Sequence, residues 1–160
     1  MKKITTYFFT AFLLCFISTV KAQSKTEIKK NVLEGIWMLK AEKKSNNLEM
    51  GYIPSPPATF KIISSDGKFI NFSTRGNNAV IGTDGLCHIE SDSIYIETIE
   101  RSVIPSLVGK NNKLIYKLNN NKLFLKFYLE KNSINQTVNI WIEEIWEKIE
   151  MPKTNPNLIR

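Results

Sequence analysis

Two glutamates are the residues best placed to do chemistry, because each lies on an alternating segment beside an aromatic residue. Tyr95 and Glu97 share one face of their segment, and Glu144 and Trp146 share one face of another. If both faces turn inward, two carboxylates occupy one interior. The pKa of at least one of them should then rise, because burial disfavours the charged form.

The glutamate on the first segment has two interpretations. Glu97 would either orient the polar end of a ligand or serve as a structural partner for Arg101, Lys148 or a tyrosine hydroxyl. Paired carboxylates are also what glycoside hydrolysis requires, but the sequence does not give the separation of Glu97 and Glu144. Enzymatic activity is therefore our third hypothesis. It would be favoured if Glu97, Glu144 and Tyr95 converged in one open pocket.

Other reaction chemistry has little support. His88 is the only histidine and has no cysteine or carboxylate at zinc-ligand spacing. Cys87 precedes it directly, so the two side chains leave opposite faces of a strand and cannot form a local nucleophile and base pair. We expect no catalytic residue, no metal site, no cofactor and no enzymatic activity.

Short alternating segments separated by turn residues must position these side chains. The segments are 35–41, 59–64, 68–73, 79–82, 86–90, 93–101, 113–118, 122–130 and 137–149. Asp-Gly, Ser-Asp and Asn-Asn sequences between them, including Thr83-Asp84-Gly85, predict tight turns and antiparallel hairpins. A sheet of about eight such strands closes into an up-and-down barrel or splits into a sandwich, and alternation favours the barrel only slightly.

The N-terminus has the pattern of a removable export signal. Lys2 and Lys3 precede an apolar stretch, Tyr7–Val20, and cleavage after Ala22 would leave Gln23 as the first residue. The apolar stretch of about 14 residues is shorter than the roughly 20 that a membrane-spanning helix needs. We therefore expect a periplasmic or secreted protein without a membrane span.

Three regions follow from this reading: a signal peptide over 1–22, a barrel domain over 23–149 and a frayed tail over 150–160. A capping-box sequence, Ser24-Lys25-Thr26-Glu27, predicts a short helix before the first strand. Signal removal takes away three lysines and no acid, so the formal charge falls from +7 to +4. The remaining lysines are scattered, which argues against a nucleic-acid partner.

A resemblance to a known family rests on several segments in order. They are Gly35-Ile36-Trp37, Ser65-Asp66-Gly67-Lys68-Phe69, 85–97, 114–118 and Glu144-Ile145-Trp146-Glu147-Lys148. Together they resemble a lipocalin-like group of small exported bacterial proteins of unknown function. The resemblance implies a closed barrel with Trp37 at its closed end. It also implies an arginine over that ring where this chain has Lys148, and an aromatic residue where it has Cys87.

Two functions are compatible with this barrel. In the first, a small, mainly apolar ligand is held in the cavity, and its walls are Trp37, Phe69, Tyr95, Glu97, Tyr116, Phe127, Glu144 and Trp146. In the second, the barrel is filled by its own side chains and the protein binds another envelope protein or a host protein. Strand number does not decide between them, because a barrel of about eight strands is either just full or holds one ligand.

Overall fold

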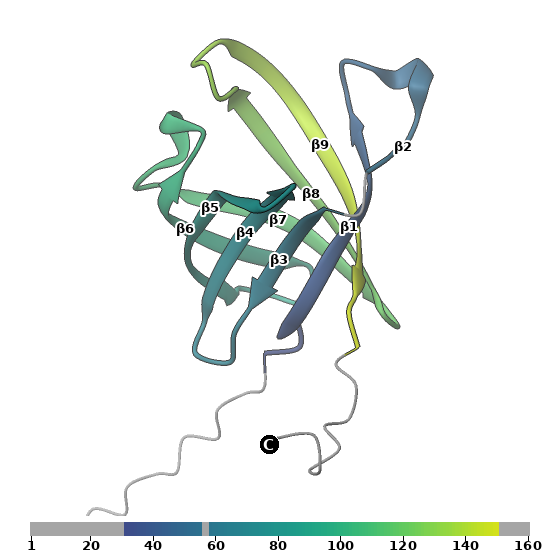
Figure 1. Ribbon diagram of the computed structural model, residues 1–160, viewed down its shortest axis with the longest axis vertical. Helices are drawn as coiled ribbons and strands as arrows, with labels where there is room; N and C mark the ends of the chain where they lie inside the picture. The colour runs from purple at the N-terminus through teal and green to yellow at the C-terminus, as the bar shows by residue number, and fades with distance from the viewer. Residues whose placement is uncertain (1–30, 56–57, 151–160) are drawn as a thin grey trace, which may run out of the picture.

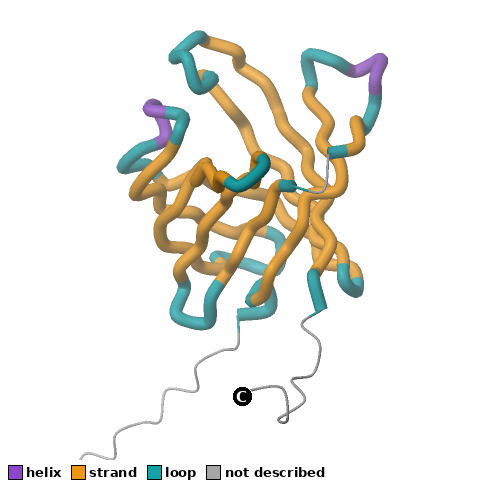
Figure 2. Tube along the Cα trace, in the orientation of Figure 1, coloured by secondary structure: helices purple, strands orange, loops and turns teal. Residues whose placement is uncertain are grey.

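The computed structural model describes residues 31–55 and 58–150, which are built almost entirely from strands (Figures 1 and 2). The strands are β1 (Gly35–Lys44), β2 (Ile53–Pro54), β3 (Thr59–Ile63), β4 (Lys68–Arg75), β5 (Asn78–Ile89), β6 (Ile94–Ser102), β7 (Asn111–Asn119), β8 (Lys122–Lys131) and β9 (Thr137–Lys148). Two single 3₁₀ turns, η1 (Leu48–Met50) and η2 (Pro105–Leu107), lie in the longer connections.

The sheet closes on itself as an up-and-down barrel. Each of the strands β3 to β8 pairs with the next strand along the chain. Strand β1 pairs with β3 on one side and with β9 on the other, which completes the ring. The ring therefore has eight antiparallel strands, with β2 added beside the upper part of β1. The prediction of an all-β, antiparallel, closed barrel is confirmed. Closure removes the long exposed edges that an open sheet would leave.

The period-two pattern of each strand places its apolar side chains in the interior. On β8, Leu123, Leu125 and Leu129 are buried inside, whereas Tyr128 is exposed outside. The main interior cluster also includes residues from every other strand of the ring, among them Trp37, Ile63, Phe69, Cys87, Tyr95, Leu114 and Trp146. A barrel of about this size is narrow enough for side chains to meet at its centre.

The two ends of the barrel differ (Figure 1). We call the end that holds the β3–β4 hairpin and residues 31–34 the base. The other end, where the β8–β9 hairpin and the β1–β2 arm rise, we call the mouth. A second interior cluster formed by Leu129, Ile140 and Ile142 belongs to the mouth, since these residues flank the β8–β9 hairpin.

One predicted turn is wrong. Thr83-Asp84-Gly85 does not separate two strands but lies inside β5, where a bulge shifts the register against β6. The bulge holds because Asp84 accepts hydrogen bonds from the Arg101 guanidinium across the strands. Gly85 has φ +153°, and a Cβ there would overlap the carbonyl oxygen of Thr98. The turn-forming residues thus bend a continuous strand.

The predicted short helix is not seen where the structure describes its end. Val32 and Leu33 lie in a turn closed by a hydrogen bond from the amide of Glu34 to the carbonyl of Asn31, and residues 24–30 lie outside the described residues. The predicted signal peptide, 1–22, lies outside them as well, as does the tail from 151 onward. Among the described helices, none is long and apolar enough to cross a membrane.

Candidate functional site

A buried ion pair occupies the centre of the barrel. The ammonium of Lys61 lies 2.5 Å from a carboxylate oxygen of Glu97, and their side chains are 2% and 3% exposed. Lys61 points inward because it lies opposite Trp37 on β1 and opposite Asn71 on β4, and residues directly opposite one another share a face. Removing both charges from water is costly, so each depends on the other.

Three aromatic rings surround the lysine ammonium. The Nζ atom of Lys61 lies 5.7 Å from the ring centroid of Phe69 and 5.6 Å from those of Tyr95 and Trp146. Rings at this distance attract a cation through the negative potential of their faces. The barrel therefore contains an aromatic cage that is built to hold a positive charge. We call Lys61, Glu97 and these three rings the cage.

A second carboxylate lies beside the cage without a cation of its own. Glu144 lies opposite Leu125 on β8, so it faces the interior, and it accepts a hydrogen bond of 2.9 Å from the indole of Trp146. Burial raises its pKa to about 7, although the charge of Lys61 and that indole hydrogen bond lower it. The residue as a whole is half-buried.

Two buried polar atoms of the interior have no hydrogen-bond partner among the described residues: the hydroxyl of Tyr95 and the amide oxygen of Asn71. Tyr95 is 0% exposed, and its pKa is raised well above the usual value, chiefly by burial and next by the charge of Glu97. Buried polar atoms normally find a partner. These two mark places where a hydrogen-bonding group is missing.

The base of the barrel is sealed around Trp37. This side chain is 0% exposed, and its indole donates a hydrogen bond of 2.9 Å to the carbonyl of Leu33. The ammonium of Lys148 lies 5.3 Å from the Trp37 ring centroid. A lysine thus takes the place over the ring where the family resemblance implied an arginine, and it supplies the same kind of cation–π contact.

The mouth side of the interior is apolar. Phe127 and Leu107 pack against both interior clusters, and Ile104 and Val138 complete the surroundings of the second one. The ionisable residues at this level neutralise each other, since the ammonium of Lys44 lies 3.0 Å from a carboxylate oxygen of Glu42. An elongated ligand entering here would meet hydrocarbon before it reached the cage.

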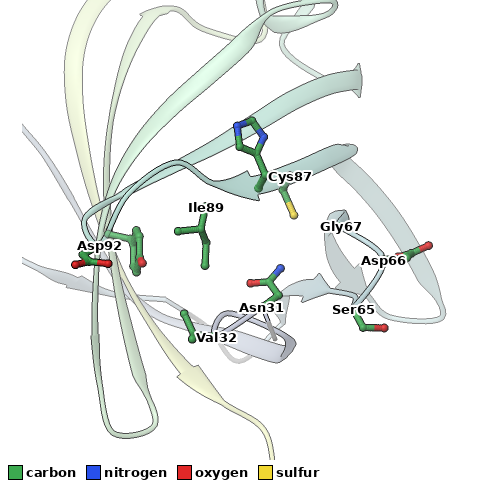
Figure 3. Close-up of a pocket in the computed structure, with 10 residues that line it drawn as sticks. Asn31, Val32, Ser65, Asp66, Gly67, Cys87, Ile89 and Asp92 are labelled. Carbon is green, nitrogen blue, oxygen red and sulfur yellow. The ribbon is translucent and has the colours of Figure 1, made fainter. Parts of the chain in front are cut away.

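A groove at the base lies outside this arrangement (Figure 3). It has a volume of about 370 Å³ and lies between residues 31–32, the β3–β4 hairpin and the end of β5. Cys87 lines it, but burial raises the pKa of this thiol, which makes it a poor nucleophile and a poor metal ligand. No group of three potential metal ligands occurs among the described residues.

The structure brings six of the eight predicted wall residues to the cage or its surroundings: Trp37, Phe69, Tyr95, Glu97, Glu144 and Trp146. Phe127 lies further toward the mouth. Tyr116 belongs to the core, but it lines the groove at the base, where its hydroxyl donates to the carbonyl of Ser91. Whether these residues bind a ligand stays a prediction.

The predicted partner of Glu97 is corrected. The ion-pair partner is Lys61 and not Arg101 or Lys148, since Arg101 bonds Asp84 and Lys148 lies over Trp37. The third predicted alternative, a tyrosine hydroxyl, stays a prediction. Sequence reasoning missed Lys61 because its strand, Thr59–Ile63, has apolar residues on both faces. The available signal was the spacing of Lys61 two residues before the buried Ile63. The expectation that a buried glutamate has a raised pKa is confirmed for Glu144.

The enzyme reading gains little from this geometry. Glu97 is closed off by its ion pair, and Tyr95 is fully buried, so the three groups do not meet in a solvent-filled pocket of the described residues. Of these three residues, only Glu144 is partly exposed, and the pKa of its carboxyl group is raised to about 7 by burial.

Comparison with known proteins gives the family and no activity. No curated protein matches the chain. An uncharacterised protein from Bacteroides eggerthii DSM 20697, solved by crystallography, shares 12% identity with a TM-score of 0.48, over 72% of this chain and 98% of that one. The model of a domain of unknown function, DUF4488, matches residues 32–157, which contain the whole barrel. The chain therefore belongs to the DUF4488 family.

Proposed function

We propose that this protein is an exported, lipocalin-like binding protein without enzymatic activity that holds a small, mainly apolar ligand inside the barrel. The proposal rests on the aromatic cage together with nearby polar groups that lack a partner. Tyr95 and Asn71 present buried polar atoms with no partner among the described residues, and Glu144 has no ion-pair partner among them. A bound ligand would supply partners for these groups.

Intrinsic fluorescence tests ligand binding directly. Trp37 and Trp146 lie in the interior, whereas Trp141 is 43% exposed on the outer face. The variant Trp141→Phe therefore keeps the two interior reporters and removes the exterior one. We expect apolar compounds of fatty-chain size to shift its emission and raise its melting temperature, because a ligand that binds only the folded state stabilises it. Unchanged emission and melting temperature across apolar, aromatic and amphipathic compounds would contradict the proposal.

Export is tested separately. We expect the protein recovered from the periplasm or the medium of a Gram-negative host to begin at Gln23, which intact mass measurement shows to within one residue. Recovery of the uncut chain in the cytoplasm would contradict this part of the proposal and leave the binding part unaffected.

A second candidate function is binding to another envelope or host protein. The observation that favours it is an exposed aromatic surface on the outer wall, formed by Tyr52, Tyr128 and Trp141. The last two rings make an edge contact with centroids 5.6 Å apart, and Lys126 and Lys43 lie over Trp141 and Tyr52. Aromatic residues are enriched at protein interfaces. A stoichiometric partner lost on Trp141→Ala but kept on a change inside the barrel would support this function over the first.

A further inference from the structure

The central interior carries more negative than positive charge when its groups are ionised. Around the cage there is one ammonium, that of Lys61, and there are two carboxyl groups, those of Glu97 and Glu144. Glu97 already neutralises Lys61 at 2.5 Å, and Glu144 takes part in no ion pair of the described residues. The other inward-facing ammonium groups are engaged elsewhere, Lys44 with Glu42 and Lys148 over Trp37.

The interior also has two buried polar atoms without a hydrogen-bond partner among the described residues. The amide oxygen of Asn71 is buried and accepts nothing within the described residues, and the hydroxyl of Tyr95 is likewise unpartnered. Asn71 lies opposite Lys61 on the neighbouring strand, and Tyr95 contributes a ring to the cage, so both lie beside the cage. A hydrogen-bond donor would satisfy the oxygen of Asn71, whereas the hydroxyl of Tyr95 both donates and accepts.

The aromatic rings favour the same chemistry. Phe69, Tyr95 and Trp146 stabilise a cation through their faces, as their positions around Lys61 show. An anionic head group would meet the opposite conditions. It would have to take Lys61 from Glu97 and leave two carboxyl groups without a cation, in surroundings where an unpaired charge is costly.

We propose that the polar end of the ligand is a protonated amine that binds between Glu144 and the rings of the cage, with its hydrocarbon part lying toward the mouth. This inference rests on the proposed binding function and names the ligand class. The ammonium donates a charge-assisted hydrogen bond to Glu144. The hydrocarbon chain packs on the apolar residues near the mouth, where Phe127 and Leu107 join the two interior clusters.

The test compares three compounds with the same ten-carbon chain and different heads: decylamine, decanol and decanoate. Each is titrated into the full mature chain carrying Trp141→Phe at pH 8, below its micelle concentration, and tryptophan emission is followed. We expect decylamine to bind roughly tenfold more tightly than either of the others, which corresponds to one well-placed charge contact. Binding of decanoate as tight as that of decylamine, or tighter, would overturn the amine assignment while leaving the binding function standing.

Binding of none of the three would instead count against the binding function itself. Equal affinities for all three would show a barrel that selects only the chain, and would overturn the amine assignment alone. The two proposals therefore fail in different ways.

A matched pair of variants locates the amine. Glu144→Gln removes the inward carboxylate, and we expect it to remove the roughly tenfold preference for decylamine over decanol. Glu143→Gln is the control, because Glu143 lies on the next position along β9 and bonds Lys126 and Tyr52 on the outer wall. Loss of the preference in the Glu143 variant, or its retention in the Glu144 variant, would contradict the placement.

Discussion

Lys61 and Glu97 form a contact of 2.5 Å at the centre of the barrel, between strands β3 and β6 that are not neighbours in the ring. The pair therefore spans the interior from one wall to the other. It couples the two halves of the barrel through a charge contact where most small barrels have hydrocarbon alone. The same pair fixes the ammonium among the rings of Phe69, Tyr95 and Trp146.

Breaking this pair should destabilise the fold strongly. We expect Lys61→Met and Glu97→Leu each to lower the free energy of unfolding by about 3–5 kcal/mol, because each leaves an uncompensated buried charge. The double variant should lose much less than the sum, with a coupling energy above about 2 kcal/mol. Urea denaturation of the four proteins measures the cycle. Additive losses would show that the two charges do not depend on each other.

The stability of the protein should depend on pH through Glu144. Its folded-state pKa is raised to about 7 from an ordinary value of 4.5, so the folded state binds a proton more tightly than the unfolded state. The stabilisation by the protonated form is present below about pH 4.5 and is lost as the pH rises toward 7. Burial is the main cause of this raised pKa. The charge of Lys61 and the hydrogen bond from Trp146 lower the pKa, and the charges of Glu42 and Glu97 raise it.

Glu144→Gln provides the comparison for this pH effect. Between pH 5 and pH 8 the wild-type protein should lose stability relative to the variant, by up to about 3 kcal/mol, because glutamine does not titrate. Melting temperatures of both proteins at the two pH values measure it. A difference between wild type and variant that is the same at both values would show that Glu144 titrates as an ordinary surface carboxyl group.

Gly85 should be far less tolerant of substitution than other glycines. Gly85→Ala would place a methyl group against the carbonyl oxygen of Thr98 and the amide of Glu100, at a φ of +153° that side chains rarely adopt. We expect a loss of more than about 2 kcal/mol. Gly76→Ala is the control, since its Cβ meets open space and only the positive φ is unfavourable, at a cost of about 1 kcal/mol. Equal losses in urea denaturation would argue against the bulge.

Cys87 should react slowly in the folded protein. Its side chain is buried, and burial raises the pKa of its thiol, so little thiolate is available to a reagent near neutral pH. We expect modification by an aromatic disulfide reagent at pH 8 to be at least about 100-fold slower in the native protein than in urea, because the reagent needs transient opening. Comparable rates would place the thiol in open solvent and contradict the inward direction of this part of β5.

The alternation of apolar and polar residues was sufficient to predict antiparallel strands, and the family resemblance implied their closure into a barrel. On β8, leucines and a phenylalanine occupy one face, and the structure places that face inside. The cage was only half predictable. The sequence indicated four residues in or beside it, because a glutamate and an aromatic residue share one face of a strand in each pair: Tyr95 with Glu97, and Glu144 with Trp146. It did not indicate the partner of Glu97, which lies on a strand distant in sequence.

Two local features could not be interpreted correctly from the sequence alone: the direction of Lys61 on β3 and the turn-like residues within β5. On β3, Phe60 and Ile62 form an apolar face, so hydrophobicity alone would place Lys61 on the solvent side. The register of β3 against Trp37 shows that Lys61 and Ile63 face the interior. On β5, Asp84 and Gly85 have the composition of a turn, yet the cross-strand bonds of Arg101 keep the strand continuous. Both errors arise because partners distant in the chain decide local geometry.

The central claim is that the ligand binds in the barrel interior and not on the outer wall. The most direct test is to follow the indole N–H resonances of the three tryptophans in ¹H–¹⁵N spectra during titration with decylamine. We predict that the resonance of Trp146, whose indole donates to Glu144, shifts progressively while that of the exposed Trp141 stays in place. A shift confined to Trp141, with Trp146 unmoved, would contradict the account.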